Sequence, residues 1–122
     1  MTKPVHIDGI DAYEGPHAIP GIRFRAARQA LGVTSWGMNV LDLDPHTEGH
    51  PEHDHAGDGQ EEVYFVIEGA AVLRLGEREL VLKRGDFVRV APEETRKLVT
   101  RDSGARILAL GATPGRAFEP KM

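Results

Sequence analysis

The sequence predicts a single all-β domain, a barrel or sandwich of antiparallel strands, and three observations support this. Its 122 residues suit one domain with one hydrophobic core. Between residues 20 and 112, short runs rich in Val, Leu, Ile and Phe are separated by Gly, Pro and Asp, which is typical of all-β proteins. Helical periodicity is hard to find along the same stretch.

The expected strands follow one another at short intervals. They cover residues 22–26, 35–43, 62–67, 71–75, 79–83, 87–91, 96–101 and 105–110. Turn residues separate several of them, at Glu68-Gly69, Gly76-Glu77, Gly85-Asp86 and Ser103-Gly104, where glycine tolerates the backbone angles of a tight turn. We therefore expect neighbouring strands to pair antiparallel, with a helical turn over residues 26–32.

The chain divides into an N-terminal arm, residues 1–19, and a β-barrel domain, residues 20–122. The arm has only a weak pattern, with apolar residues such as Val5 and Ile7, and we expect it to pack on a neighbour.

Composition excludes several partners. The formal net charge is −4 and the basic residues are scattered, so we expect no nucleic-acid binding. The start lacks the apolar run of a signal peptide and no segment approaches 18 apolar residues, so we expect a cytoplasmic protein without membrane contact. The chain has no Cys, so any metal must be held by nitrogen and oxygen ligands.

Four of the six His residues lie within ten positions, from His46 to His55. On a strand, His53 and His55 point to the same side, with a separation that lets two imidazoles bind one ion. A hairpin through residues 56–59 would return Glu61 or Glu62 beside the pair. This pattern predicts a metal site, and the alternative is a solvated, polar strand end.

The other His residues lack supporting spacing. His50 has the opposite parity to His53 and follows an expected turn, so we place it at the rim or surface. His6, His17 and His46 are expected at the surface.

These residues resemble the two motifs of the cupin superfamily, over roughly residues 47 to 101. The first motif is Gly-x5-His-x-His, three or four residues, then Glu-x6-Gly. His53, His55, Glu62 and Gly69 match it in register, which favours Glu62 as the carboxylate. Two positions depart from it: the leading Gly falls at Thr47, and six residues separate the second His from the Glu.

The second cupin motif, Gly-x5-Pro-x-Gly-x2-His-x3-Asn, is degenerate here. Gly85 and Pro92 are present with one extra residue between them. Anchored on Pro92, Lys97 takes the place of the His, whereas anchored on Gly85, Arg96 takes it. Under either alignment the fourth metal ligand of the family is missing.

The resemblance implies a small single-domain cupin with a jelly-roll β-barrel, holding a divalent Fe, Mn, Ni or Zn ion through His53, His55 and Glu62. Two His and one carboxylate resemble the facial triad of non-haem iron oxygenases. Because strand neighbours face opposite ways, either Arg96 or Lys97 should lie near the pocket. The alternative is that both belong to a solvated strand face.

Three further residues are candidates for the pocket wall. Trp36 and Met38 share one face of a run leading towards the His cluster, and Tyr64 shares the face of Glu62. The alternative is that all three belong to the barrel core.

Two functions follow from this pattern. One is a metal-dependent oxygenase, such as a dioxygenase, or isomerase acting on a small molecule. The other is a metal-free module that binds or senses a small anionic ligand without catalysis. The resemblance also implies a homodimer, and no individual catalytic residue is assigned.

Overall fold

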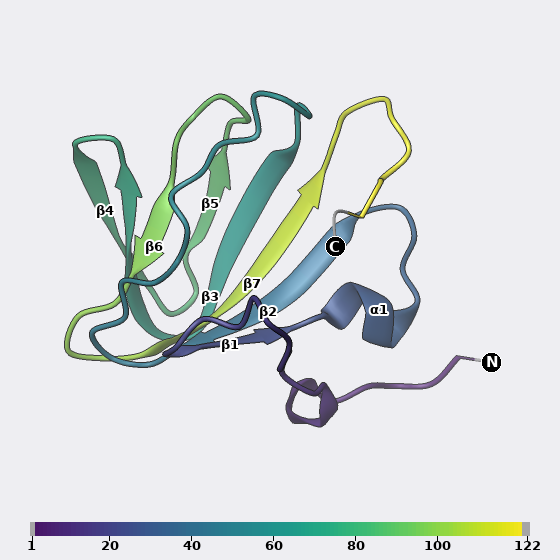
Figure 1. The fold of residues 1–122 in the computed structure, drawn as a ribbon, viewed down its shortest axis with the longest axis horizontal. Coiled ribbons are helices and arrows are strands. Elements are labelled where there is room, and N and C mark those ends of the chain that lie inside the picture. Colours follow the sequence, from purple (N-terminus) through teal and green to yellow (C-terminus); the bar gives the residue numbers. More distant parts are fainter. Residues whose placement is uncertain (1, 121–122) are drawn as a thin grey trace.

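The computed structural model describes residues 2–120, which form an antiparallel jelly roll (Figure 1). The elements are the 3-10 helix Ile7–Gly9, β1 (Ile22–Arg25), α1 (Ala27–Leu31), β2 (Gly37–Leu43), β3 (Glu61–Leu75), β4 (Arg78–Lys83), β5 (Phe87–Val90), β6 (Lys97–Val99) and β7 (Ala105–Ala112). The strand order is β1-β2-β7-β3-β4, and β5 and β6 also pair with β3. The all-β prediction is confirmed.

Strand β3 crosses the whole barrel, so the turn expected at Glu68-Gly69 is wrong. A register shift between Val66 and Glu68 bends the strand without ending it. Its first half pairs with β5 and its second half with β4 and β6. Gly69 is required at the bend, because its φ is +77° and a Cβ there would lie 2.0 Å from the Gly104 carbonyl oxygen.

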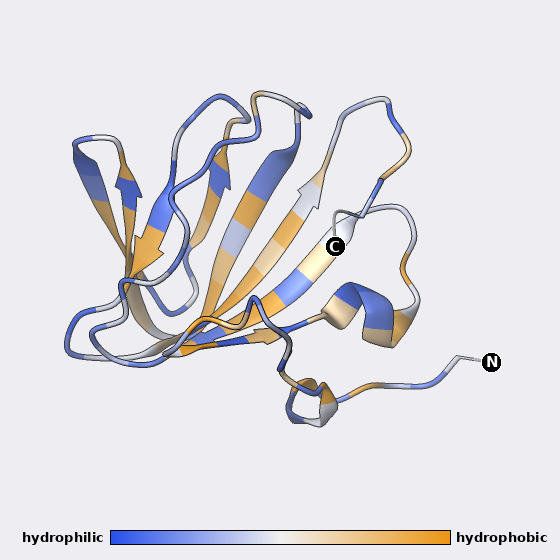
Figure 2. Cartoon of the chain, in the orientation of Figure 1, coloured by the Kyte–Doolittle hydropathy of each residue, from blue (hydrophilic) through white to orange (hydrophobic). Residues whose placement is uncertain are grey.

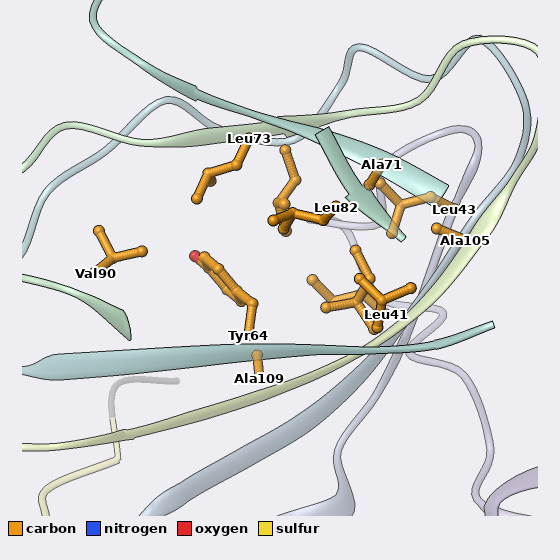
Figure 3. Packing of buried hydrophobic residues seen from close by; sticks show 12 residues of the cluster. Leu41, Leu43, Tyr64, Ala71, Leu73, Leu82, Val90, Ala105 and Ala109 are labelled. Atoms are coloured by element: carbon orange, nitrogen blue, oxygen red, sulfur yellow. The ribbon is translucent and has the colours of Figure 1, made fainter. Parts of the chain in front are cut away.

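The main core fills the space between the two halves of the barrel. Alternate residues of each strand belong to it. Figure 2 shows the matching alternation of apolar and polar positions along the strands. In β3 the inward residues include Tyr64, which Figure 3 shows between Val90 and Ala109. The inward face of β3 is therefore defined by residue parity, and Glu62 belongs to it.

A second, smaller cluster lies outside the main core. Ile10 of the N-terminal arm packs there with Ala27 and Val40, and the arm also forms a bridge between Ala12 and Arg25. The arm therefore packs on its own chain around Ile7 to Ala12, whereas residues 2–6 are exposed. The first residue of the arm and the last two of the expected barrel range lie outside the described residues.

The outer face of β2 also carries a buried carboxylate, Asp42, which is 6% exposed. Its two oxygens accept hydrogen bonds from the Nε atoms of Arg25 and Arg106, at 2.9 and 2.7 Å. Burial opposes its ionisation, but the bonds from Arg106 and Arg25 outweigh burial and lower the pKa of Asp42.

Within residues 2–120, no helix has both the length and the apolar character needed to cross a membrane.

Candidate metal centre

His53 and His55 lie on the long connection between β2 and β3. The expected hairpin with β3 is wrong, because the backbone of His53 pairs with Arg96: Arg96 N–H donates to His53 O at 2.8 Å, and His53 N–H donates to Arg96 O at 3.1 Å. The next contact runs from His55 N–H to Pro92 O, at 2.7 Å. The connection runs along the free edge of β6. Among the named strands β6 pairs only with β3, so the backbone groups on its other edge need partners, and the connection lies beside them.

Glu62 reaches the same point from the start of β3. Its carboxylate oxygen Oε1 lies 3.4 Å from His55 Nε2 and 3.7 Å from His53 Nε2. Each of the three residues offers a ligand atom within 4.8 Å of the others. The structure therefore brings together the two His and the Glu that the motif selects.

Each imidazole is held at Nδ1, on the side of the ring that faces away from Glu62. His53 Nδ1 lies 2.9 Å from the Pro51 carbonyl oxygen, and His55 Nδ1 lies 3.2 Å from both carboxylate oxygens of Asp58. A carbonyl and an ionised carboxylate only accept hydrogen bonds, so each Nδ1 must carry the proton. In the neutral rings, both Nε2 lone pairs then face Glu62. This back support is typical of metal-binding histidines.

Arg96 occupies the inward position that the second motif gives to a fourth ligand. Its side chain has no exposed surface, and its Nη1 donates to Glu62 Oε1 at 2.6 Å. Its other two nitrogens donate to the carbonyl oxygens of Ala91 and Glu94, at 2.6 and 2.9 Å. Lys97 falls on the opposite side of β6, since the next residue, Leu98, packs in the core.

The charges of the site support one another. Tyr64 donates its hydroxyl to Glu62 Oε1 at 3.1 Å, and burial raises its pKa, so it stays protonated. Burial opposes ionisation of Glu62, but His53, His55 and Arg96 outweigh it and hold the pKa of Glu62 below its usual value. The carboxylate in turn raises the pKa of His53. Glu62 is therefore an anion at neutral pH.

His50 is buried, so its expected place at the rim or surface is wrong. The side chain accepts the Leu98 backbone N–H at Nδ1, at 3.0 Å, and its ring centroid lies 5.6 Å from that of His53. Burial is the main cause that lowers the pKa of His50 to about 4, so the ring is neutral at pH 7. Parity could not predict this, because the segment is not a strand.

Two pocket candidates lie elsewhere. Met38 packs with Ile10, Ala27 and Val40 in the smaller cluster, and Trp36 is 44% exposed just before β2. The inward residues of β2 have the opposite parity, as Leu41 shows by its place in the main core. Tyr64 and Arg96 are the pocket candidates that contact Glu62.

The antiparallel jelly roll with two His and one Glu converging inside it defines a small cupin. The family model for the cupin domain matches residues 39–110, so the chain belongs to the cupin domain family. No curated protein matches the sequence.

Solved structures share the fold. A sugar phosphate isomerase of the cupin superfamily from Silicibacter pomeroyi DSS-3 is 24% identical, with a TM-score of 0.78 over 98% of this chain and 83% of that chain. The polyketide cyclase RemF from Streptomyces resistomycificus is 19% identical, with a TM-score of 0.76 over 99% and 88%. A Cupin 2 conserved barrel domain protein from Salinispora arenicola is 16% identical, with a TM-score of 0.69 over 93% and 89%. At these identities the similarity concerns the fold alone.

Proposed function

We propose that this protein is a metal-dependent cupin that binds a small molecule at His53, His55 and Glu62 and acts on it as an oxygenase or isomerase. One observation carries the proposal: both imidazoles hold Nδ1 against a protein acceptor and place Nε2 within 3.7 Å of the same Glu62 carboxylate oxygen, which is how two metal-ligating imidazoles are arranged. Two His and one carboxylate suit Fe, Mn, Ni or Zn. When bound, such an ion supplies Lewis-acid or oxygen-activating chemistry.

The electrostatics of the group call for a cation. The two Nε2 atoms lie 3.4 and 3.7 Å from one carboxylate oxygen, so the group needs a positive charge between them, either a proton on His53, whose pKa the carboxylate raises, or a bound cation. The guanidinium of Arg96 contacts the same carboxylate, but its nitrogens are engaged by Glu62 and by two backbone carbonyls. A divalent ion at the three ligand atoms would supply this charge.

Arg96 and Tyr64 hold the Glu62 carboxylate in position and in its ionised form. Both donate to Glu62 Oε1, so they hold the side chain in place and keep it ionised. With Arg96 in the place of a fourth ligand, residues 2–120 offer three protein ligands at this point. The remaining coordination positions of an ion would then be available to a substrate or to water.

The same arginine bears on the metal-free alternative, in which a basic pocket binds an anion. Arg96 is the inward basic residue, but it is fully buried and each of its nitrogens already donates to the protein. An anion would have to displace Glu62 or a backbone carbonyl. This cost favours the metal-dependent proposal.

The choice of reaction has fold-level support only. The similarity to a sugar phosphate isomerase agrees with an isomerase, and the three-residue ligand set agrees with an oxygenase. We therefore propose both reaction classes and test the metal first.

Metal analysis tests the proposal directly. Untagged protein, purified without chelator and reconstituted with Fe²⁺ or Mn²⁺, should hold about one ion per chain, as expected for a single three-ligand site. His55→Ala should abolish uptake without unfolding the chain. His17→Ala, a matched change at an exposed His, should leave uptake unchanged. A wild-type protein that cannot be loaded with any of the four metals would overturn the proposal.

We also propose a cytoplasmic homodimer. Phe87 of β5 is 71% exposed and lies against Phe65 of β3, with ring centroids 4.2 Å apart, so this face presents apolar surface for a second copy. Light scattering after size exclusion should give the mass of a dimer for the wild type and of a monomer for Phe87→Lys. A monomeric wild type would contradict the dimer, and recovery in the membrane or secreted fraction would contradict the location.

A further inference from the structure

The segment between His55 and Glu62 is longer than the family pattern and turns back on the histidine. The backbone N–H groups of Asp58 and Gly59 both donate to His55 O, at 3.3 and 2.8 Å. Gly59 adopts a φ of +70°, which closes this turn. The longer loop therefore delivers the Asp58 carboxylate to the back of the His55 ring, where both oxygens lie 3.2 Å from Nδ1.

The loop is fixed at several points. Gln60 N–H donates to Asp58 Oδ1 at 3.0 Å, and the Thr113 hydroxyl donates to Asp58 O at 2.9 Å. Thr113 directly follows β7, so the loop is tied to the sheet as well as to itself. The Gln60 side chain also fills the space over Gly111, because a Cβ there would lie 2.4 Å from Gln60 Oε1. Asp58 is thus held where it meets His55.

We propose that Asp58 is a positioning residue for the metal centre, which holds the proton of His55 on Nδ1 and leaves the Nε2 lone pair free for the ion. The inference rests on the proposed function for its metal-binding part. The side chains of Asp58 and His55 are both about one-fifth exposed, at 18% and 19%, so water screens their interaction only in part. A carboxylate behind a ligating imidazole also makes that imidazole a stronger ligand.

The charge of Asp58 has a second consequence. When both His act as neutral metal ligands, Glu62 contributes one negative charge and Arg96 one positive charge, so these four groups sum to zero. Asp58 adds one negative charge next to them and makes the assembly anionic. A divalent cation is held more strongly by an anionic assembly than by a neutral one. The longer loop therefore offsets the charge that Arg96 brings into the site.

Four variants separate these effects. Asp58→Ala removes both the acceptor and the charge, whereas Asp58→Asn keeps an acceptor and removes the charge. Asp54→Ala is the charge control, because Asp54 lies on the same connection between β2 and β3, just before His55, and its carboxylate accepts from Ala56 N–H. Thr113→Val is the loop control, because it removes the tether to the Asp58 backbone and leaves the carboxylate in place.

The first readout needs no metal. Nitrogen-15 NMR of the metal-free protein reports which ring nitrogen of His55 carries the proton. We expect the Nδ1–H form in the wild type, Asp54→Ala and Thr113→Val, and a shift to Nε2–H or a mixture in Asp58→Ala. An unchanged Nδ1–H form in a folded Asp58→Ala would overturn the role of Asp58. If Asp58→Ala does not fold, the wild type and Asp58→Asn provide the test. A His55 ring protonated on Nε2 in either protein would also overturn the role of Asp58.

The second readout is the affinity for Mn²⁺ by titration. Loss of an outer-shell partner typically weakens metal binding by about 10- to 100-fold, and we expect this loss in Asp58→Ala and a smaller one in Asp58→Asn. Asp54→Ala and Thr113→Val should stay within about threefold of the wild type. Equal affinities for Asp58→Ala and the wild type would contradict the inference while leaving the metal site intact. A wild type that binds no metal would instead contradict the proposed function, and NMR would still decide what Asp58 does.

Discussion

Removing the Arg96 guanidinium should destabilise the metal-free protein strongly. In Arg96→Met, Glu62 remains as a carboxylate with 14% of its side chain exposed, but it loses the donor that lies 2.6 Å from Oε1. The carbonyl oxygens of Ala91 and Glu94 lose the Arg96 donor in the same change, and Ala91 O keeps the Glu94 N–H at 3.1 Å. The methionine fills most of the arginine volume, so the main cost is electrostatic.

The size of the effect follows from burial. Removing one partner of a buried ion pair costs about 3 to 5 kcal/mol in the free energy of unfolding, because the other charge stays buried without compensation. For a domain of this length, about 4 °C of melting temperature corresponds to 1 kcal/mol, so we expect a fall of roughly 12 to 20 °C. Arg74→Met is the matched control. Arg74 also joins two carboxylates, Glu48 and Glu79, but it is solvent-exposed and should matter far less.

Urea unfolding in the presence of chelator measures these differences. The set is the wild type, Arg96→Met, Glu62→Gln and the double variant. Because Glu62→Gln removes the charge that Arg96→Met leaves unpaired, the double variant should be less destabilised than the sum of the two single variants. Additive losses, or an Arg96→Met no less stable than Arg74→Met, would refute the reasoning that the pair is buried and coupled.

Three further predictions concern other parts of the molecule. Arg96→His replaces a cation by the imidazole that the family motif has at this place, so Mn²⁺ should bind at least about tenfold more tightly. The pKa of Asp42 is lowered, because hydrogen bonds from Arg106 and Arg25 outweigh burial. This shift stabilises the folded state above about pH 4, and the stabilisation is lost as pH falls through the folded-state pKa. The stability advantage of the wild type over Asp42→Asn should therefore shrink between about pH 5 and pH 2. Gly69→Ala should cost about 2 kcal/mol or more, because φ is positive and the added Cβ meets a backbone oxygen.

Each of these three predictions has an outcome that would contradict it. Titration of Mn²⁺ into Arg96→His with no gain in affinity would show that position 96 does not face the ion. A stability difference between the wild type and Asp42→Asn that stays constant with pH would contradict the ionised Asp42 network. Gly57→Ala is the control for Gly69→Ala, since a Cβ at Gly57 meets nothing within 4 Å. Equal melting temperatures for these two glycine variants would contradict the steric argument.

The sequence by itself determined the kind of fold and the three convergent residues. Apolar runs and turn residues predicted the all-β domain, because strands with one buried face and glycine turns leave a local pattern. The motif register selected His53, His55 and Glu62, and also showed that Arg96 or Lys97 replaces the fourth ligand. These conclusions depend on residue type and spacing, which a single chain displays directly.

The tertiary structure alone decided which side chains meet. It placed Arg96 rather than Lys97 inward, buried His50 against β6, and turned Met38 towards the smaller cluster. It also brought Asp58 behind His55, through a loop whose path no periodic pattern describes. Parity predicts a facing direction only within a regular strand whose buried face is known. The residues of irregular connections are placed instead by hydrogen bonds to elements distant in sequence, such as those that tie residues 47–55 to β6 and to the segments beside it.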